Sequence, residues 1–368
     1  MENAPGKHLQ PFALQEAGRG DEATAASARL DSPPDNDRYV RFPASFGRRF
    51  TIFVDTEEEF DWGRPLRREN RDVTAIRAMP AMHERMRAAG AKPVYLVDHP
   101  IAAAPEAVAV LRPWADKGEC TIGTQLHPWV NPPFDEEVNP FNSYTGNLPL
   151  QLQRAKLAVL TDTIERAFGV RPTVYRAGRY GVGARTAALL EEAGYTIDLS
   201  VRSLFDYRRQ HGPNFAQVRP QPYWVGDGGL LEVPLSAAFT GRLRRAGGWL
   251  FPATAGLPRI RSVLARTGLL ARIALTPEDM PLEDVRRAIA HLLADGAQHL
   301  SISFHSPSVE PGHTPYVRTA ADLAAFHAWW DGLFETFDAQ GIEPASIEDV
   351  LAAARAARDA RESKVRSS

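Results

Sequence analysis

Acidic side chains follow an apolar run near the start of this sequence, at the spacing that proton transfer or metal binding requires. Residues 50–62 read Phe-Thr-Ile-Phe-Val-Asp-Thr-Glu-Glu-Glu-Phe-Asp-Trp, so a β-branched and aromatic run leads directly into five carboxylates. Such a run is typical of a buried strand in a parallel sheet. A charged Asp55 directly after that strand makes physical sense only in a cleft, where it could take a proton from a reactant.

Further polar residues stand at the ends of later apolar runs. In chain order they are Asp98 and His99, Gln125 and His127, Arg176 and Arg179, Asp198, and His305. The carboxyl ends of the strands of an α/β barrel meet at one rim, which is where barrel enzymes carry their catalytic residues. An open dinucleotide-binding sheet would instead have a glycine-rich turn after its first strand, and this sequence has none there. The pattern therefore favours a barrel enzyme.

Strands and helices alternate between these positions. Strands are expected at 50–55, 92–97, 120–126, 173–175, 196–199, 299–304 and 342–347, and helices at 73–89 (broken by Pro80), 103–117, 150–168, 185–193, 282–294, 320–339 and 346–357. Roughly seven strand-helix units predict an α/β fold, a distorted (β/α) barrel. The alternation loosens over 202–275, where we expect an irregular insertion with a β-hairpin at 223–235 and a basic, glycine-rich stretch at 241–267.

The two ends of the chain lack this periodicity. Residues 1–45 mix Gly, Pro, Ala, Asp, Glu and Ser, and we expect a flexible leader there because little apolar surface could offset the entropy of ordering. A single barrel domain is expected over 46–357, followed by a flexible tail over 358–368.

Composition narrows the class of partner. The net charge of −2 and the pI near 6.6 give the whole chain no attraction to nucleic acid or to an anionic membrane, so a small neutral substrate fits better. The single cysteine, Cys120, excludes an internal disulfide and a cysteine-rich zinc site. No apolar run reaches the length of a membrane span, and no secretion signal is recognisable. We therefore expect a soluble, cytoplasmic protein.

The order of the motifs resembles a known family. The acid-ending first strand is followed by Gly-Thr-Gln-Leu-His at 123–127, Tyr-Arg-Ala-Gly-Arg-Tyr at 175–180, Ile-Asp-Leu-Ser at 197–200 and Ser-Phe-His-Ser-Pro at 303–307. This set is similar to the polysaccharide deacetylase superfamily, with its NodB homology domain and family 4 carbohydrate esterases, and to the WalW-like branch within it. The resemblance covers about residues 50–350 and implies a NodB-like distorted barrel that hydrolyses an N- or O-acetyl group on a sugar.

The resemblance also implies roles for four catalytic residues. Asp55 would be the general base that takes a proton from the attacking water, and Arg176 would hold its carboxylate. His305 would be the general acid that protonates the leaving group. Asp198 would orient a histidine or a substrate hydroxyl, and a nearby carboxylate of this kind would favour the imidazolium form of His305.

A divalent metal, zinc before others, is implied as the cofactor. Its ligands would be Glu57, His127 and Gln125, although the His-x-x-x-His spacing of the family is not met in this chain. Either Gln125 supplies an amide oxygen where the family has a histidine, or the four-residue spacing places Trp129 there, which cannot bind a metal.

An acetylated sugar or polysaccharide is the implied partner. Side chains expected to contact it are His99, Trp129, Arg179, Tyr180 and Trp62, whereas Glu58, Glu59 and Asp61 are expected on the surface or behind the cleft. Two other functions remain open from the residues. One is a carbohydrate-binding pseudoenzyme without metal. The other is a hydrolase of a non-peptide carbon–nitrogen bond in a small molecule, acting without a tightly held metal.

Overall fold

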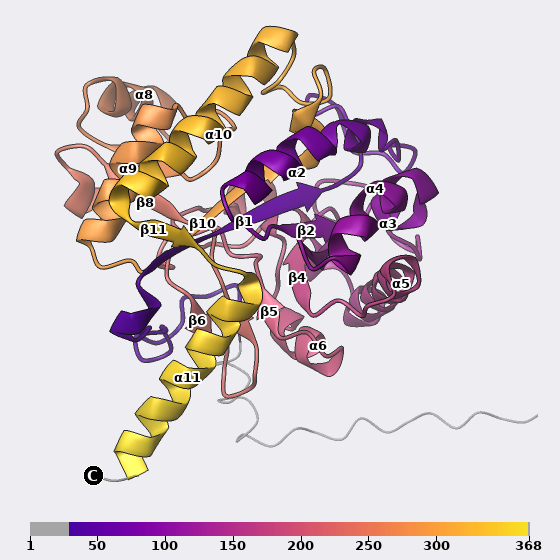
Figure 1. Cartoon of the computed structure of the whole chain (residues 1–368), viewed down its shortest axis with the longest axis horizontal. Helices are drawn as coiled ribbons and strands as arrows, with labels where there is room; N and C mark the ends of the chain where they lie inside the picture. Colours follow the sequence, from indigo (N-terminus) through magenta and orange to yellow (C-terminus); the bar gives the residue numbers. More distant parts are fainter. Residues whose placement is uncertain (1–28, 367–368) are drawn as a thin grey trace, which may run out of the picture.

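The computed structural model describes residues 29–366, and its main element is a curled nine-stranded sheet with helices packed outside it (Figure 1). The strands of this sheet are β1 (Arg48–Thr56), β2 (Val94–Val97), β3 (Thr121–Leu126), β4 (Val174–Ala177), β5 (Ile197–Asp198), β6 (Tyr223–Trp224), β7 (Leu231–Glu232), β10 (His299–His305) and β11 (Ile342–Pro344). Their spatial order is β10-β1-β2-β3-β4-β5-β7-β6, with β11 paired to the start of β1. Neighbours along the sheet are parallel except β6 and β7, so the predicted distorted barrel is confirmed.

Most helices of the described chain lie where the apolar periodicity predicts them, whereas α7 and α8 fall in the region expected to be irregular. They are α2 (Met79–Ala88), α3 (His99–Ala103), α4 (Pro105–Asp116), α5 (Leu150–Phe168), α6 (Thr186–Glu192), α7 (Gly247–Ala253), α8 (Pro258–Arg266), α9 (Leu282–Ala294), α10 (Ala320–Gln340) and α11 (Ile347–Arg366). Short 3-10 helices lie at Ala44–Phe46, Thr74–Ala78, Thr145–Asn147, Gly178–Tyr180, Arg208–Gln210, Arg244–Ala246 and Ser306–Val309. The helix expected at 73–89 is divided beside Pro80, into the 3-10 helix Thr74–Ala78 and α2, and Pro80 lies in the first turn of α2, where its missing N–H costs nothing. No helix of residues 29–366 is long and apolar enough to cross a bilayer.

Strand β1 is the longest strand of the sheet and pairs with three others, β10, β2 and β11. It lies between β10 and β2, and its last seven residues are all buried. The pairing register places Asp55 opposite His305 of β10, and on β3 and β4 it places Gln125 opposite Arg176. The polar residues at the strand ends are therefore brought to one rim by backbone pairing alone.

The region expected to be an irregular insertion supplies the last two strands of the sheet and a separate strand pair beside β10. It contains β8 (Ala237–Thr240) and β9 (Ala271–Ala274), a separate antiparallel pair, and the expected hairpin of β6 and β7. No ladder pairs β7 with β10, and the segment between them contacts β10 through two reciprocal serine hydrogen bonds and a backbone bond from Ser303 N to Leu275 O at 3.2 Å. Ser236 N donates to Ser301 Oγ at 2.8 Å, and Ser301 N donates to Ser236 Oγ at 3.0 Å. We call this junction the serine seam, and it places the residues after β9 beside the end of β10.

Both expected chain-end boundaries are wrong within the described residues. Leu30, Tyr39, Val40 and Phe42 of the supposed leader are buried, and Val40 N donates to Pro222 O at 2.8 Å. Residues 1–28 lie outside the described part of the chain. At the other end α11 continues through the supposed tail to Arg366, well past the expected end at 357. Charged residues there contact the barrel rather than fray, because long arginine side chains reach backbone carbonyls that apolar periodicity does not reveal.

His299 at the start of β10 makes the stability of the fold sensitive to acid. The imidazole is buried, and its Nε2 donates to Thr51 Oγ1 at 3.0 Å, because that hydroxyl donates in turn to Ala345 O at 3.1 Å. Burial lowers the pKa of His299 to about 3. The folded protein therefore keeps this imidazole neutral, while the unfolded chain binds a proton below about pH 6.5. Stability from this residue is complete above that pH and is lost as the pH falls toward 3.

Replacing His299→Gln keeps an N–H donor and removes the titration. Relative to this variant, the wild-type protein should lose about 1.4 kcal/mol of unfolding free energy per pH unit between about pH 6 and pH 4. Urea unfolding of both proteins at matched pH measures the difference, and the other histidines cancel because both proteins contain them. Equal pH slopes would show that His299 does not titrate in this way.

Candidate active site

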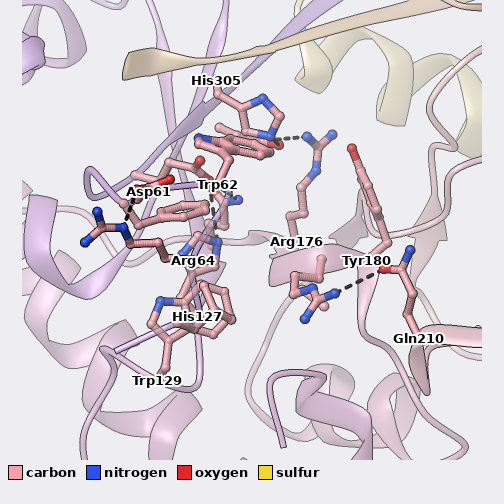
Figure 2. Close-up of a pocket in the computed structure, with 16 residues that line it drawn as sticks. Asp61, Trp62, Arg64, His127, Trp129, Arg176, Tyr180, Gln210 and His305 are labelled. Carbon is pink, nitrogen blue, oxygen red and sulfur yellow. Dashed lines mark hydrogen bonds and ion pairs between the residues drawn. The ribbon is translucent and has the colours of Figure 1, made fainter. Parts of the chain in front are cut away.

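A cleft of about 360 Å³ opens at the carboxyl ends of the strands (Figure 2). Its walls come from the ends of β1, β3, β4 and β10 and from the loops that follow them. The lining residues are Asp55, Glu57, Phe60, Asp61, Trp62, Arg64, Leu66, Gln125, His127, Trp129, Arg176, Ala177, Arg179, Tyr180, Gln210 and His305. The structure thus brings together ten of the twelve side chains singled out from the sequence, leaving out His99 and Asp198.

Asp55 is held between a cation and an imidazole. Its carboxylate is 3% exposed, and Oδ1 accepts a hydrogen bond from Arg176 Nη1. Arg176 is itself fixed by donation from Nε to Leu199 O at 3.0 Å. The other oxygen, Oδ2, lies 3.6 Å from Nε2 of His305. Because one oxygen is neutralised and positioned by the arginine, the other is free to accept a proton on the cleft side.

Glu278 is the carboxylate partner of His305. Its Oε2 accepts from His305 Nδ1 at 2.6 Å, while Oε1 accepts from His305 N at 2.9 Å and from Ser308 Oγ at 2.8 Å. Burial on its own would lower the pKa of His305, but the charges of Glu278 and Glu57 outweigh it and raise that pKa to about 10. His305 is therefore an imidazolium at neutral pH and can donate a proton.

The expectation that Asp198 would serve His305 is wrong. Asp198 is fully buried and accepts from Ser200 Oγ at 2.6 Å. It belongs to β5 and does not line the cleft. Glu278, which follows β9 beside the serine seam, contacts His305 directly instead. The available sequence signal was the mostly apolar stretch Leu-Ala-Arg-Ile-Ala-Leu at 270–275, at the end of the region treated as irregular, followed closely by Glu278 and Asp279.

The three expected metal ligands meet on one side of the cleft. Gln125 and His127 are two residues apart at the end of β3, so their side chains leave the strand on the same face. Gln125 Nε2 donates to Glu57 Oε2 at 3.1 Å, and His127 Nε2 lies 3.5 Å from the same oxygen. Burial raises the pKa of Glu57 to about 8, against the lowering effect of His305 and His127.

This donor set fits a divalent cation. Glu57 Oε1 and Gln125 Oε1 are buried without a hydrogen-bond partner, and both residues line the cleft with His127. One carboxylate, one imidazole and one amide oxygen can all bind a metal, but zinc sites usually carry more imidazole, thiolate or carboxylate ligands than this. Zinc would therefore be held more weakly here than by two histidines.

Glu58 orients His127 from behind the cleft. The side chain is fully buried; Oε2 accepts from His127 Nδ1 at 2.8 Å and Oε1 accepts from Trp129 Nε1 at 2.6 Å. The proton on Nδ1 leaves the lone pair of His127 Nε2 facing Glu57, which is the tautomer that a metal ligand needs.

Glu58, Asp98 and His127 also have ligand atoms within 4.8 Å of one another. However, Glu58 and Asp98 do not line the cleft, and Asp98 Oδ2 accepts from Glu58 N at 2.8 Å, so we assign them to positioning.

Aromatic and basic side chains form the remaining walls. Trp62 stacks on Phe60 at 5.0 Å and meets His305 edge-on at 4.9 Å, and Figure 2 shows Trp62 and Tyr180 at the cleft together with Arg176 and His305. Arg179 and Tyr180 have φ values of 55° and 60°, which is uncommon for residues other than glycine and indicates a constrained turn at a functional position.

Two of the expected substrate contacts have other roles. Trp129 is 2% exposed, its ring centroid lies 4.4 Å from that of His127, and its Nε1 donates to Glu58. Its main role is therefore to hold His127 in place, because little of its ring is open to a sugar. His99 does not line the cleft, because Asp98 caps the helix that begins at His99 and turns the chain away from the rim.

Comparisons with known proteins concern the fold. No protein-family profile and no curated protein sequence matches the chain. Among solved structures it is similar to a protein of Mycobacterium smegmatis assigned to the polysaccharide deacetylases, with 17% identity, a TM-score of 0.44, and coverage of 86% of this chain and 98% of that one. The 4-alpha-glucanotransferase of Thermococcus litoralis matches with 12% identity, a TM-score of 0.48, and coverage of 83% and 40%. Peptidoglycan deacetylase PdaC of Bacillus subtilis matches with 12% identity, a TM-score of 0.38, and coverage of 88% and 98%.

Proposed function

We propose that the chain is a hydrolase that removes an acetyl group from a sugar or polysaccharide. The observation that carries this proposal is the meeting of two oppositely charged groups in the cleft. Asp55, fixed by Arg176, and His305, fixed by Glu278, approach to 3.6 Å between Oδ2 and Nε2. A base and an acid so close together, each with its own buried partner, suit a reaction in which one proton is taken and another is given.

The proton transfers balance for hydrolysis of an acetyl amide or ester. Asp55 Oδ2 takes a proton from water as the water oxygen bonds to the carbonyl carbon. His305 Nε2 then gives its proton to the leaving nitrogen or oxygen as the carbon–heteroatom bond breaks, which yields acetate and a free amine or alcohol. A divalent cation held by Glu57, His127 and Gln125 would polarise the carbonyl and lower the pKa of the water.

The cleft walls support a carbohydrate as the class of substrate. Trp62 offers a partly exposed indole beside His305, and Arg179 lies over the ring of Tyr144 with its guanidinium 4.5 Å from the centroid. Aromatic faces take the apolar faces of sugars, and Arg179 and Gln210 could donate hydrogen bonds to hydroxyls.

Acetate release from acetylated sugars tests the proposal. Purified protein, with and without added zinc, is offered N-acetylated chitooligosaccharides, O-acetylated xylan and a small N-acetylated amide. Release of acetate from the chitooligosaccharides or from the xylan supports the proposal. Turnover of the small amide alone would move the function to a non-sugar carbon–nitrogen bond. That second candidate is favoured by one observation, the hydrogen bond from Gln125 to Glu57, which gives one of the two carboxylate oxygens, Oε2, a partner without a metal.

Glu278→Gln should lower turnover about a hundredfold and shift its pH dependence. The amide cannot accept from His305 Nδ1, His305 N and Ser308 together, so the imidazolium loses both its orientation and its main source of stabilisation. Activity that depends on protonated His305 falls as the pH rises through about 10 in the wild-type protein. Without the charge of Glu278 the pKa of His305 falls, so this decrease of activity at high pH, the alkaline limb of the pH profile, should move to lower pH.

The matched control is Glu283→Gln, an exposed glutamate in the first turn of α9. It should leave both turnover and the alkaline limb unchanged. A Glu278→Gln protein with lower turnover but an unmoved limb would mean that Glu278 only supports the fold.

A further inference from the structure

A basic segment, residues 241–268, stands apart from the rest of the chain in charge. It contains six arginines and no aspartate or glutamate, in a protein whose net charge is −2. It includes α7 and α8 and follows β8, and Figure 1 places α8 at the periphery of the molecule, outside β8 and α9. None of these residues lines the active-site cleft.

The basic segment also holds most of the exposed apolar surface. Of the eight large apolar side chains that are exposed in the described part of the chain, five belong to it: Leu243, Trp249, Leu257, Ile260 and Val263. Trp249 is 68% exposed and Val263 is 57% exposed. Helix α8 has no buried residue, and Ile260 and Val263 share one of its faces because they are three residues apart. The face of α8 that carries Ile260 and Val263 is therefore open to solvent.

Most of the arginines here have no acidic partner. Arg242, Arg245, Arg259 and Arg266 are exposed, and no carboxylate among residues 29–366 pairs with them. The other two are used inside the fold: Arg244 pairs with Asp295 at 2.8 Å, and Arg261 lies 3.9 Å over the ring of Phe251. The four free cations and the exposed apolar groups therefore lie within one short stretch of chain.

We propose that the basic segment docks on an anionic bilayer surface, with the arginines at lipid phosphates and Trp249, Ile260 and Val263 among the headgroups and upper acyl chains. A helix with exposed apolar residues flanked by arginine is typical of interfacial binding, and tryptophan prefers this depth. An acidic protein or polyanion would match the charges but leave the aliphatic groups in water. A second copy would bring the same positive charge to the same place. The contact lies in the interface plane, since no described helix can span a bilayer.

Vesicle sedimentation of the full chain tests this proposal. The protein should sediment with vesicles of phosphatidylglycerol and phosphatidylcholine, not with pure phosphatidylcholine, and should be released by salt. Its tryptophan emission should shift to shorter wavelength with the anionic vesicles, and Trp249→Phe should remove that shift. Binding that ignores lipid charge, or no binding at all, overturns the proposal, as does binding to a soluble polyanion such as polyglutamate without binding to vesicles.

Replacing arginines by glutamine measures how much each one contributes to binding of anionic vesicles. The double variant Arg259→Gln, Arg266→Gln should lower the partition onto anionic vesicles about thirtyfold, because each arginine contributes about fivefold. The control double variant, Arg166→Gln with Arg185→Gln, removes two exposed arginines from α5 and from the start of α6 and should bind normally. Acetate release in solution should be the same in both, since neither pair touches the cleft. Equal partition of the two double variants would overturn the proposal.

Discussion

Asp55→Asn is expected to lower the rate of acetate release by about a hundred- to ten-thousandfold, the usual worth of a general base. Asparagine has nearly the same shape and can still accept from Arg176 through its amide oxygen, but it cannot take a proton from water. The loss should therefore fall on kcat, with a much smaller change in KM. Steady-state kinetics on the best acetylated sugar measure both values.

The same substitution tests the buried ion pair. Arg176 is 1% exposed, and without the Asp55 charge it has lost its direct anionic partner, which typically costs about 3 kcal/mol or more. Kinetics should therefore be run well below the melting temperature, which circular dichroism gives. Asp61→Asn is the matched control, because Asp61 lies on the cleft rim, half exposed and paired with Arg64 at 3.0 Å. Unchanged turnover in a folded Asp55→Asn protein would refute the proposed base.

Gln125→His is expected to tighten zinc binding by at least about tenfold. The residue at this position leaves β3 on the same face as His127, and its side chain already reaches Glu57. An imidazole there would complete a set of two histidines and one carboxylate, the kind of ligand set that catalytic zinc sites use. Competition with a zinc-binding dye measures the affinity directly, independently of any activity.

A histidine introduced on the exposed face of a helix is the control for the expected increase in zinc affinity. Gln151→His adds an imidazole to the exposed face of α5 and should leave zinc affinity unchanged. In the presence of zinc, the Gln125→His protein should release acetate faster than the wild type, because a larger fraction of the protein would hold the cation that lowers the pKa of the attacking water. If zinc affinity does not change, then Glu57, His127 and residue 125 do not form a metal site.

The sheet and most of the cleft could be predicted because they follow from local pattern. Parallel strands share one rim, so Asp55, Arg176 and His305 could be placed together from the ends of apolar runs alone. Helices α5 and α9 were predicted to the residue, since each has clear apolar periodicity and a glycine or proline at an end.

What the sequence could not reveal depends on long-range contacts. Glu278 follows a four-residue strand whose register is set by β8 and the serine seam, neither of which leaves a periodic signal. Glu57, Glu58 and Glu59 are consecutive, and only the bend after β1 decides which of them faces the cleft, which faces His127 and which caps Thr74–Ala78. The basic stretch at 241–267 was visible in the sequence, but the net charge of the whole chain gave no sign that it leaves exposed arginines beside exposed apolar side chains.

The serine seam gives the acid and the base of the proposed reaction separate origins. Asp55 and Arg176 belong to the continuous ladder of the sheet, whereas Glu278 reaches His305 from the segment after β9, which joins β10 through the serine seam and one backbone hydrogen bond from Ser303 N to Leu275 O at 3.2 Å. The segment between β7 and β10 can therefore be regarded as an exchangeable module. Its length and content could vary among descendants, or be redesigned in the laboratory, and each version would retune the proton donor without disturbing the proton acceptor.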